Sequence, residues 1–156
     1  DDGVRSVVLM ITNVSLISIF CTDLDETRDF YVDVLGFKPG EDISFGDYRW
    51  VTVIHPNQPE LSLHVTTPGA PLDDGLTEAI TRSLAAGSMT SIGVTVDDCQ
   101  ATFEDLSAKG VTFIQEPADR PYGKEAILRD NAGNWLVMVE NKEYTPEDFE
   151  GFDFSE

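Results

Sequence analysis

The feature that most constrains the fold of this chain is an internal repeat. Residues 13–22 alternate in the manner of a strand, and Asp23 then offers an N-cap to a helix. The same succession returns in residues 91–98, where Asp98 follows Asp23 by 98 − 23 = 75 residues. A repeat of this length within 156 residues predicts two structural units of similar design in one domain-sized chain.

Each unit continues in the same order after its cap. An apolar helical stripe ends at Gly36 in the first unit and at Gly110 in the second, and glycine commonly ends a helix. Three strand candidates follow each helix: residues 37–40, 48–54 and 60–65 in the first unit, and residues 111–115, 126–129 and 135–139 in the second. The repeated order predicts an α+β fold of two paired βαβββ modules.

Segments of different composition separate and follow the two modules. We expect four parts: a first βαβββ module in residues 11–66, a linker with a short helix in residues 67–89, a second βαβββ module in residues 90–141, and an acidic C-terminal tail in residues 142–156. Residues 1–9 are interpreted as an extension upstream, because Met10 makes a natural start.

The charge balance excludes two classes of partner. Ten Lys and Arg stand against 29 Asp and Glu, a formal net charge of −19. Because such a chain repels phosphates, we exclude nucleic acid and an anionic membrane surface, and we expect attraction of cationic ligands. The longest apolar run, residues 7–11, is too short for a membrane span, and Cys21 and Cys99 are typical of packing positions. We therefore expect a cytoplasmic protein.

Three segments carry a resemblance to a known family. They are Thr22-Asp-Leu-Asp-Glu with Phe30-Tyr and Leu35-Gly-Phe37, then Val96-Asp-Asp with Leu106-Ser-Ala-Lys-Gly-Val111, then Arg129-Asp-Asn-Ala-Gly-Asn-Trp135. At this spacing they resemble the marker segments of the vicinal oxygen chelate superfamily, which includes glyoxalase, bleomycin-resistance and extradiol-dioxygenase proteins. The resemblance implies an open, cup-shaped mixed sheet around one cavity, while the fold alone names no reaction.

The resemblance also implies where a metal ion would bind. Metal-dependent members hold one divalent ion with His, Gln or Glu side chains from the first and last strands of their modules. The matching positions here are Leu16, Ser91 and Val137, and only the strand around His64 still offers conventional donors. Because a transition metal needs about three protein ligands, we expect no cofactor and no metal site. A divalent metal held by an atypical ligand set is the alternative.

Strand alternation predicts which side chains line the cavity. Trp50 and Trp135 are expected to face inward and to stack on a planar or cationic molecule, with burial in the core as the alternative. Residues 119–124 are typical of a loop at the cavity mouth or of a surface hairpin. The expected ligand-binding residues are Phe20, Trp50, Thr52, Ser62, His64, Ser91, Arg120, Tyr122 and Trp135.

We interpret the chain as a metal-free protein that sequesters or accommodates a small, cationic or aromatic compound, as the resemblance to bleomycin-resistance members implies. The alternative is a lyase, isomerase or dioxygenase with an atypical metal site, or a cofactor-free acid–base catalyst. In that catalyst His64 shuttles the proton, and Glu60 orients it or raises its pKa. Exposed sheet edges indicate a homodimer.

Overall fold

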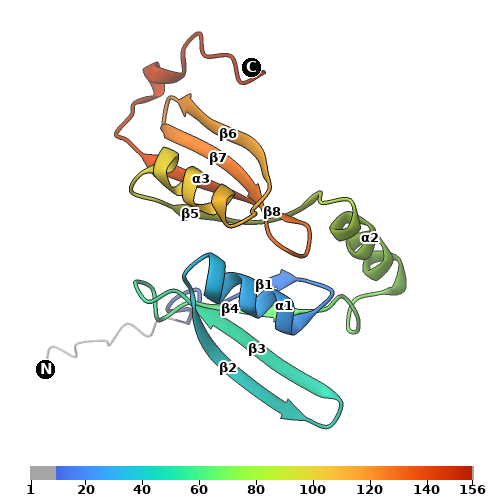
Figure 1. The fold of residues 1–156 in the computed structure, drawn as a ribbon. Coiled ribbons are helices and arrows are strands. Elements are labelled where there is room, and N and C mark those ends of the chain that lie inside the picture. Colours follow the sequence, from blue (N-terminus) through green and yellow to red (C-terminus); the bar gives the residue numbers. More distant parts are fainter. Residues whose placement is uncertain (1–9, 156) are drawn as a thin grey trace, which may run out of the picture.

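The computed structural model of the chain describes residues 10–155 (Figure 1). Residues 1–9, interpreted above as an upstream extension, and residue 156 lie outside the described residues. The elements are β1 (Leu16–Phe20), α1 (Leu24–Asp29), the π-helix η1 (Phe30–Val34), β2 (Lys38–Phe45), β3 (Tyr48–Ile54), β4 (Ser62–Thr66), α2 (Asp74–Ala85), β5 (Met89–Thr95), α3 (Cys99–Ala108), β6 (Phe113–Arg120), β7 (Gly123–Arg129), β8 (Asn134–Asn141) and the 3₁₀-helix η2 (Pro146–Phe149).

The strands form two four-stranded mixed sheets. Their orders are β1-β4-β3-β2 and β5-β8-β7-β6, and each sheet has one parallel pair, β1 with β4 and β5 with β8. The remaining neighbours are antiparallel. The predicted α+β fold of two βαβββ modules is confirmed, and no hydrogen-bonded strand pair joins the two sheets within residues 10–155.

The repeated start and stop signals act as the sequence predicts. The Asp23 side chain accepts a hydrogen bond from the backbone N–H of Glu26 at 3.0 Å, and Asp98 accepts one from Ala101 at 2.9 Å. Gly36 has a φ of 82° and Gly110 a φ of 89°, a region that disfavours residues with a Cβ atom. The repeat therefore encodes two helical segments with the same start and stop signals, although the first passes from α1 into the π-helix η1 before it reaches Gly36.

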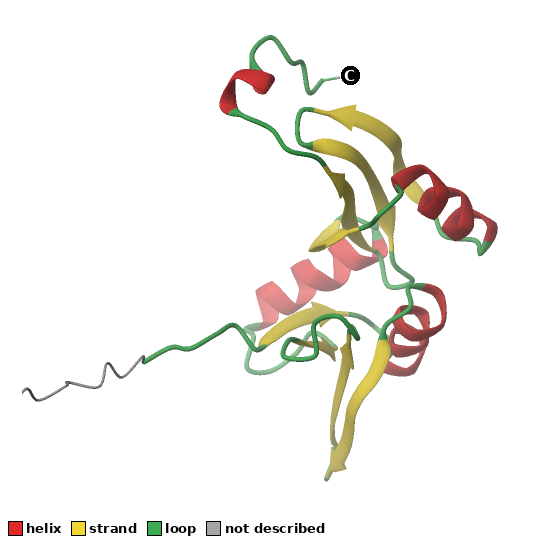
Figure 2. Cartoon of the chain, turned by 90° about the vertical axis from the view of Figure 1, so that its left-hand side faces the viewer, coloured by secondary structure: helices red, strands yellow, loops and turns green. Residues whose placement is uncertain are grey.

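Helices α1 and α3 lie on the same side of the two sheets (Figure 2). We call the covered side of each sheet its helix-bearing face and the other side its open face. One apolar core lies on the helix-bearing faces and draws on both modules; its buried members are Ile19, Tyr31, Val53, Leu63, Cys99, Leu106, Ala126, Leu128, Leu136 and Met138. The modules are therefore held together through the faces that carry their helices.

A buried polar network also joins the modules. The Tyr31 hydroxyl donates to Asp130 at 2.9 Å, and the Asn134 side chain donates to the carbonyl oxygen of Phe20 at 2.7 Å and to Asp130 at 2.8 Å. The other Asp130 oxygen accepts the backbone N–H groups of residues 132–134. Burial and the nearby Asp130 charge raise the pKa of Tyr31 well above its ordinary value. The third marker segment thus folds into the turn that fastens the two modules.

The acidic tail folds back over the end of the β6–β7 hairpin (Figure 1). The ring of Phe149 stacks on Tyr122 with centroids 6.3 Å apart. The Arg120 guanidinium lies 5.8 Å from the ring centroids of both Phe152 and Phe154. We call residues 142–155 the C-terminal arm.

Two further expectations concern cysteines and membrane spans. Cys21 and Cys99 are free and buried, as the sequence predicts, and burial raises the pKa of Cys21 to about 11. Such thiols are packing residues, because the reactive thiolate is disfavoured. Within residues 10–155, no helix has the length and apolar content needed to cross a membrane.

Candidate functional site

The open face of the first sheet carries a stacked aromatic pair. The half-buried Trp50 on β3 lies over His64 on β4, with ring centroids 4.1 Å apart and planes inclined by 20°. Thr52 lies directly opposite His64 in the sheet register, and its hydroxyl accepts the backbone N–H of Glu41 at 2.8 Å. Strand register therefore brings together three of the residues expected to bind a ligand.

His64 is the incompletely satisfied member of this group. Its side chain is nine-tenths buried, and Nε2 has no hydrogen-bond partner among the described residues. Burial lowers the pKa of His64 below its ordinary value, which keeps the ring neutral at pH 7. This direction is opposite to the rise considered from the sequence, and Glu60 is exposed and precedes β4. A buried polar atom without a partner is rare in folded proteins and calls for a ligand group or a water.

Exposed apolar side chains surround the stack. On the register of β2 with β3, Ile43 lies opposite Trp50, and Phe45 lies opposite Tyr48 with ring centroids 5.0 Å apart. We call this surface the open patch; its members are Leu16, Ile43, Phe45, Tyr48, Trp50 and His64. Contiguous exposed apolar surface of this kind is typical of interaction and ligand sites.

Two more predicted residues lie on the strands beside the patch. Ser62 is half-buried on β4 and lies opposite Leu16 and Ile54, so it shares the face of His64. Phe20 is half-buried at the end of β1, and its carbonyl oxygen accepts the hydrogen bond from Asn134 that joins the modules. The register thus places Ser62 beside the open patch and Phe20 at its edge.

The second sheet separates the remaining predicted residues. Trp135 is half-buried near the start of β8, opposite Arg129 on β7. Arg120 lies opposite Gly123, and Gly123 pairs with Asn141 at the far end of β8. At the rise of an extended strand, Asn141 is about 20 Å from Trp135. The structure therefore does not bring Arg120 and Trp135 together.

Arg120 and Tyr122 belong to a polar cluster beneath the C-terminal arm. The Arg120 guanidinium donates to the Gln115 side chain at 3.2 Å and lies 3.6 Å from Glu125. The Tyr122 hydroxyl forms a hydrogen bond with Glu125. Burial and this carboxylate raise the pKa of Tyr122 to about 12. Residues 119–124 form a tight hairpin, with Arg120 ending β6 and Gly123 beginning β7.

The donor set of metal-dependent relatives is missing at the matching positions. Leu16 is exposed on the open face, and Val137 is half-buried on β8. Ser91 lies where the pairing of β5 with β8 is irregular, and it lines a cleft between the modules. No cluster of three or more His, Cys, Asp or Glu within residues 10–155 is arranged to hold a metal ion. The residues present therefore do not fit the metal that the resemblance implies.

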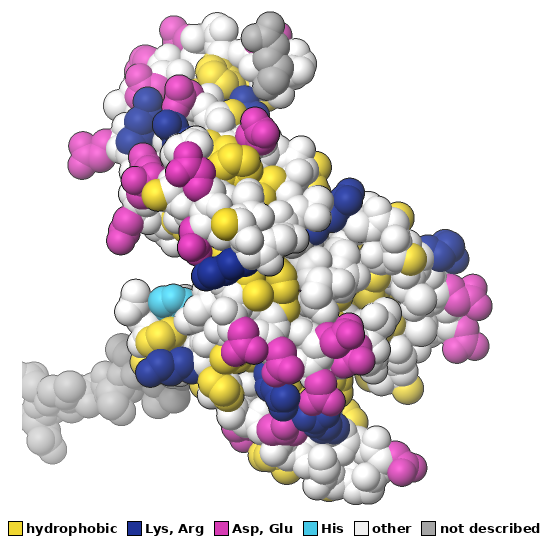
Figure 3. Space-filling view, viewed as in Figure 1, with side chains coloured by type: hydrophobic (Ala, Val, Ile, Leu, Met, Phe, Trp, Pro, Cys, Tyr) yellow, Lys and Arg dark blue, Asp and Glu magenta, His cyan; other side chains and the backbone are white. Residues whose placement is uncertain are grey.

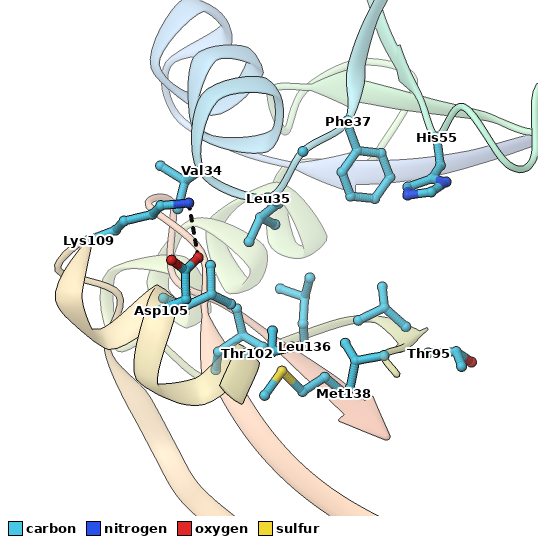
Figure 4. Close-up of a pocket in the computed structure, with 15 residues that line it drawn as sticks. Val34, Leu35, Phe37, His55, Thr95, Thr102, Asp105, Lys109, Leu136 and Met138 are labelled. Carbon is cyan, nitrogen blue, oxygen red and sulfur yellow. Dashed lines mark ion pairs between the residues drawn. The ribbon is translucent and has the colours of Figure 1, made fainter. Parts of the chain in front are cut away.

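The sequence predicts one cavity lined by the open faces, whereas a cleft between the modules is lined by residues of the helix-bearing faces, such as Leu63, Leu136 and Met138. Two cavities of about 340 and 720 Å³ share Phe37, His55, Val94 and Thr95, and we call them together the inter-module cleft. Figure 3 shows a notch between the modules, and Figure 4 shows the side chains of the smaller cavity. His55 follows β3 in a turn. The only sequence signal that could have drawn attention to His55 is that the chain has just two histidines.

Comparisons with known proteins agree with the fold. Residues 13–138 match the family described as the Glyoxalase/Bleomycin resistance protein/Dioxygenase superfamily. The crystal structure of UcmS2 is similar at 34% identity and a TM-score of 0.77, covering 85% of this chain and 100% of that chain. TnmS3, an antibiotic binding protein from Streptomyces sp. CB03234, is similar at 24% identity and a TM-score of 0.69, covering 86% and 100%, which is a likeness of fold. The uncharacterized protein YurT of Bacillus subtilis is 28% identical over 123 residues, 79% of this chain and 94% of YurT.

Proposed function

Because the chain belongs to the glyoxalase/bleomycin resistance protein/dioxygenase superfamily, we propose that it binds and sequesters a small aromatic or cationic molecule on the open patch. The observation that carries this proposal is the half-buried Trp50, which stacks on His64 and has exposed apolar side chains beside it. A bound ligand would stack on the free face of the indole, whose other face already lies against His64.

Charge and precedent support the same class of ligand. The net charge of −19 attracts cations, and acidic side chains are spread over both modules in Figure 3. A cation over the indole face gains a further attraction from the ring quadrupole. TnmS3, which shares the fold, is described as an antibiotic binding protein, and this use of the fold supports the proposal for the present chain.

We further propose that a second copy of the chain covers the open patch. Ile43, Phe45 and Tyr48 are 47%, 60% and 44% exposed, an apolar surface that association would remove from water. A homodimer would supply a second wall for the ligand from another module, such as the face that carries Trp135. Sedimentation velocity at micromolar concentration is expected to show a dimer, and Phe45→Glu a monomer. A wild-type monomer would contradict this part of the proposal.

The binding proposal is tested by a tryptophan-fluorescence titration with proflavine, a planar aromatic cation. Stacking on one indole contributes about 0.5–2 kcal/mol, so Trp50→Ala is expected to weaken binding between about twofold and thirtyfold without unfolding the domain. Trp135→Ala is titrated in parallel, and thermal melts of both variants confirm folding. If proflavine quenches neither tryptophan, or if both variants bind it with unchanged affinity, the sequestration proposal is wrong.

A further inference from the structure

The inter-module cleft lies on the helix-bearing side of the molecule, away from the open patch, and the function proposed above does not use it. Its two cavities, of about 340 and 720 Å³, are within the range of small-molecule pockets. We infer that this cleft is a second binding site, which takes a small, flat, uncharged molecule that bears a hydrogen-bond acceptor such as a carbonyl oxygen.

The two walls of the cleft come from different modules and are suited to a flat guest. Phe37 and His55 form the wall of the first module, with their rings edge to face and 5.4 Å apart. Leu136 and Met138 project from β8 on the other side of the gap (Figure 4). A guest ring between these walls would contact an aromatic surface on one side and a polarisable thioether on the other.

His55 supplies a polar group of known direction. Its Nδ1 accepts the backbone N–H of Asn57 at 3.0 Å, so the proton of the neutral imidazole is on Nε2. A guest that meets Nε2 must therefore offer an acceptor. Because the tautomer is set by the backbone of the adjoining turn, the donor is present before the guest arrives.

The charges of the smaller cavity favour an uncharged guest, and Asp97 lines only the larger cavity. Lys109 and Asp105 line the smaller cavity, and the Lys109 ammonium lies 3.0 Å from the Asp105 carboxylate (Figure 4). The two charges compensate each other at close range, so neither is left to select an ion of the opposite sign. This distinguishes the smaller cavity from the open patch, for which a cation is proposed.

The test is a nuclear magnetic resonance titration of the full chain labelled with carbon-13 in its methionine methyl groups. Met138 is buried in a wall of the cleft, whereas Met10 is 97% exposed and provides an internal reference. The probes are 2-acetylnaphthalene, which has a carbonyl acceptor, and 2-ethylnaphthalene, which lacks one. We expect a saturable shift of the Met138 methyl signal with both probes, and tighter binding of the acetyl compound by roughly twofold to tenfold, the value of one hydrogen bond.

Two variants separate the cleft from the open patch. His55→Phe keeps a ring in the wall and removes the donor, so it is expected to abolish the preference for the acetyl compound while both probes still bind. Trp50→Ala removes the stacking ring of the open patch and is expected to leave the Met138 titration unchanged. Phe37→Leu preserves an apolar wall and is expected to weaken both probes several-fold, with a thermal melt to check that the variant is folded.

Three results would overturn the inference. They are a Met138 signal that does not move at saturating probe, a preference for the acetyl compound that survives in His55→Phe, and a Met138 response that disappears in Trp50→Ala. The function proposed for the open patch fails or holds separately, because it is read from proflavine and the tryptophan signals.

Discussion

The junction between the modules and the open face of the first sheet differ in how fully their polar groups are satisfied. At the junction, Asp130 accepts hydrogen bonds from Tyr31, Asn134 and three backbone N–H groups. On the open side, His64 Nε2 is buried and has no partner among the described residues. A satisfied network rigidifies the fold, whereas an unsatisfied buried group costs stability unless something binds it. The comparison indicates that the junction stabilises the fold, whereas the open face of the first sheet keeps a buried group unsatisfied.

The largest effect is expected at Asp130. Asp130→Ala leaves a buried phenol, an amide and three backbone N–H groups without their acceptor, and it is expected to lower the free energy of unfolding by about 2–4 kcal/mol. Urea denaturation measures the change. Asp119→Ala removes an acid whose side chain is 92% exposed and is expected to change the value by less than about 0.5 kcal/mol. Equal losses of unfolding free energy in the two variants would show that Asp130 contributes no more to stability than an exposed acid does.

A smaller effect is expected where the turn of the same junction meets α2. Gly133 has a φ of 103°, and an added Cβ atom would collide with the carbonyl oxygen of Leu84, whereas Gly110 has a φ of 89° and open space around it. Gly110→Ala should therefore cost about 1 kcal/mol of backbone strain, and Gly133→Ala about 1–2 kcal/mol more. Thermal melts of the two variants provide the comparison. If Gly110→Ala lowers the melting temperature as much as Gly133→Ala does, the close contact with α2 is not the reason why glycine is needed at position 133.

The pH dependence of stability sharpens the comparison on the open side. Burial lowers the pKa of folded His64 below its ordinary value, so the unfolded chain takes up a proton first as the pH falls. The stability associated with neutral His64 is present above pH 6.5 and is lost as the pH falls below it. His64→Gln is expected to show a shallower loss of unfolding free energy between pH 7 and pH 5. An unchanged slope in that variant would mean that His64 is not the titrating group.

The smallest effect is expected from metal removal. The positions that match the metal ligands of other superfamily members carry Leu16 and Val137, whose side chains donate no lone pair. Elemental analysis of protein purified without chelator should find well under one equivalent of transition metal, and dialysis against chelator should leave the melting temperature unchanged. One equivalent of metal, with a melting temperature that falls on its removal, would refute the assignment of the open faces as metal-free.

Much of the fold was predictable because its signals are local. Asp23 and Asp98 cap their helices, and Gly36 and Gly110 end them, through contacts within a few residues of the chain. Alternation along β3 and β4 was sufficient to place Trp50 on the same face as His64, since strand side chains repeat every second residue.

The rest depends on contacts between segments far apart in the chain. Ser91 lies at an irregular pairing with β8, which interrupts the alternation on which its predicted place depended. Arg120 is covered by the C-terminal arm, which the sequence analysis predicted only as an acidic tail. The partnership of Asp130 with Tyr31, and the cleft at His55, exist because two modules dock on their helix-bearing faces. No periodicity within one module encodes the surface of the other, so these features arise only when the modules pack together.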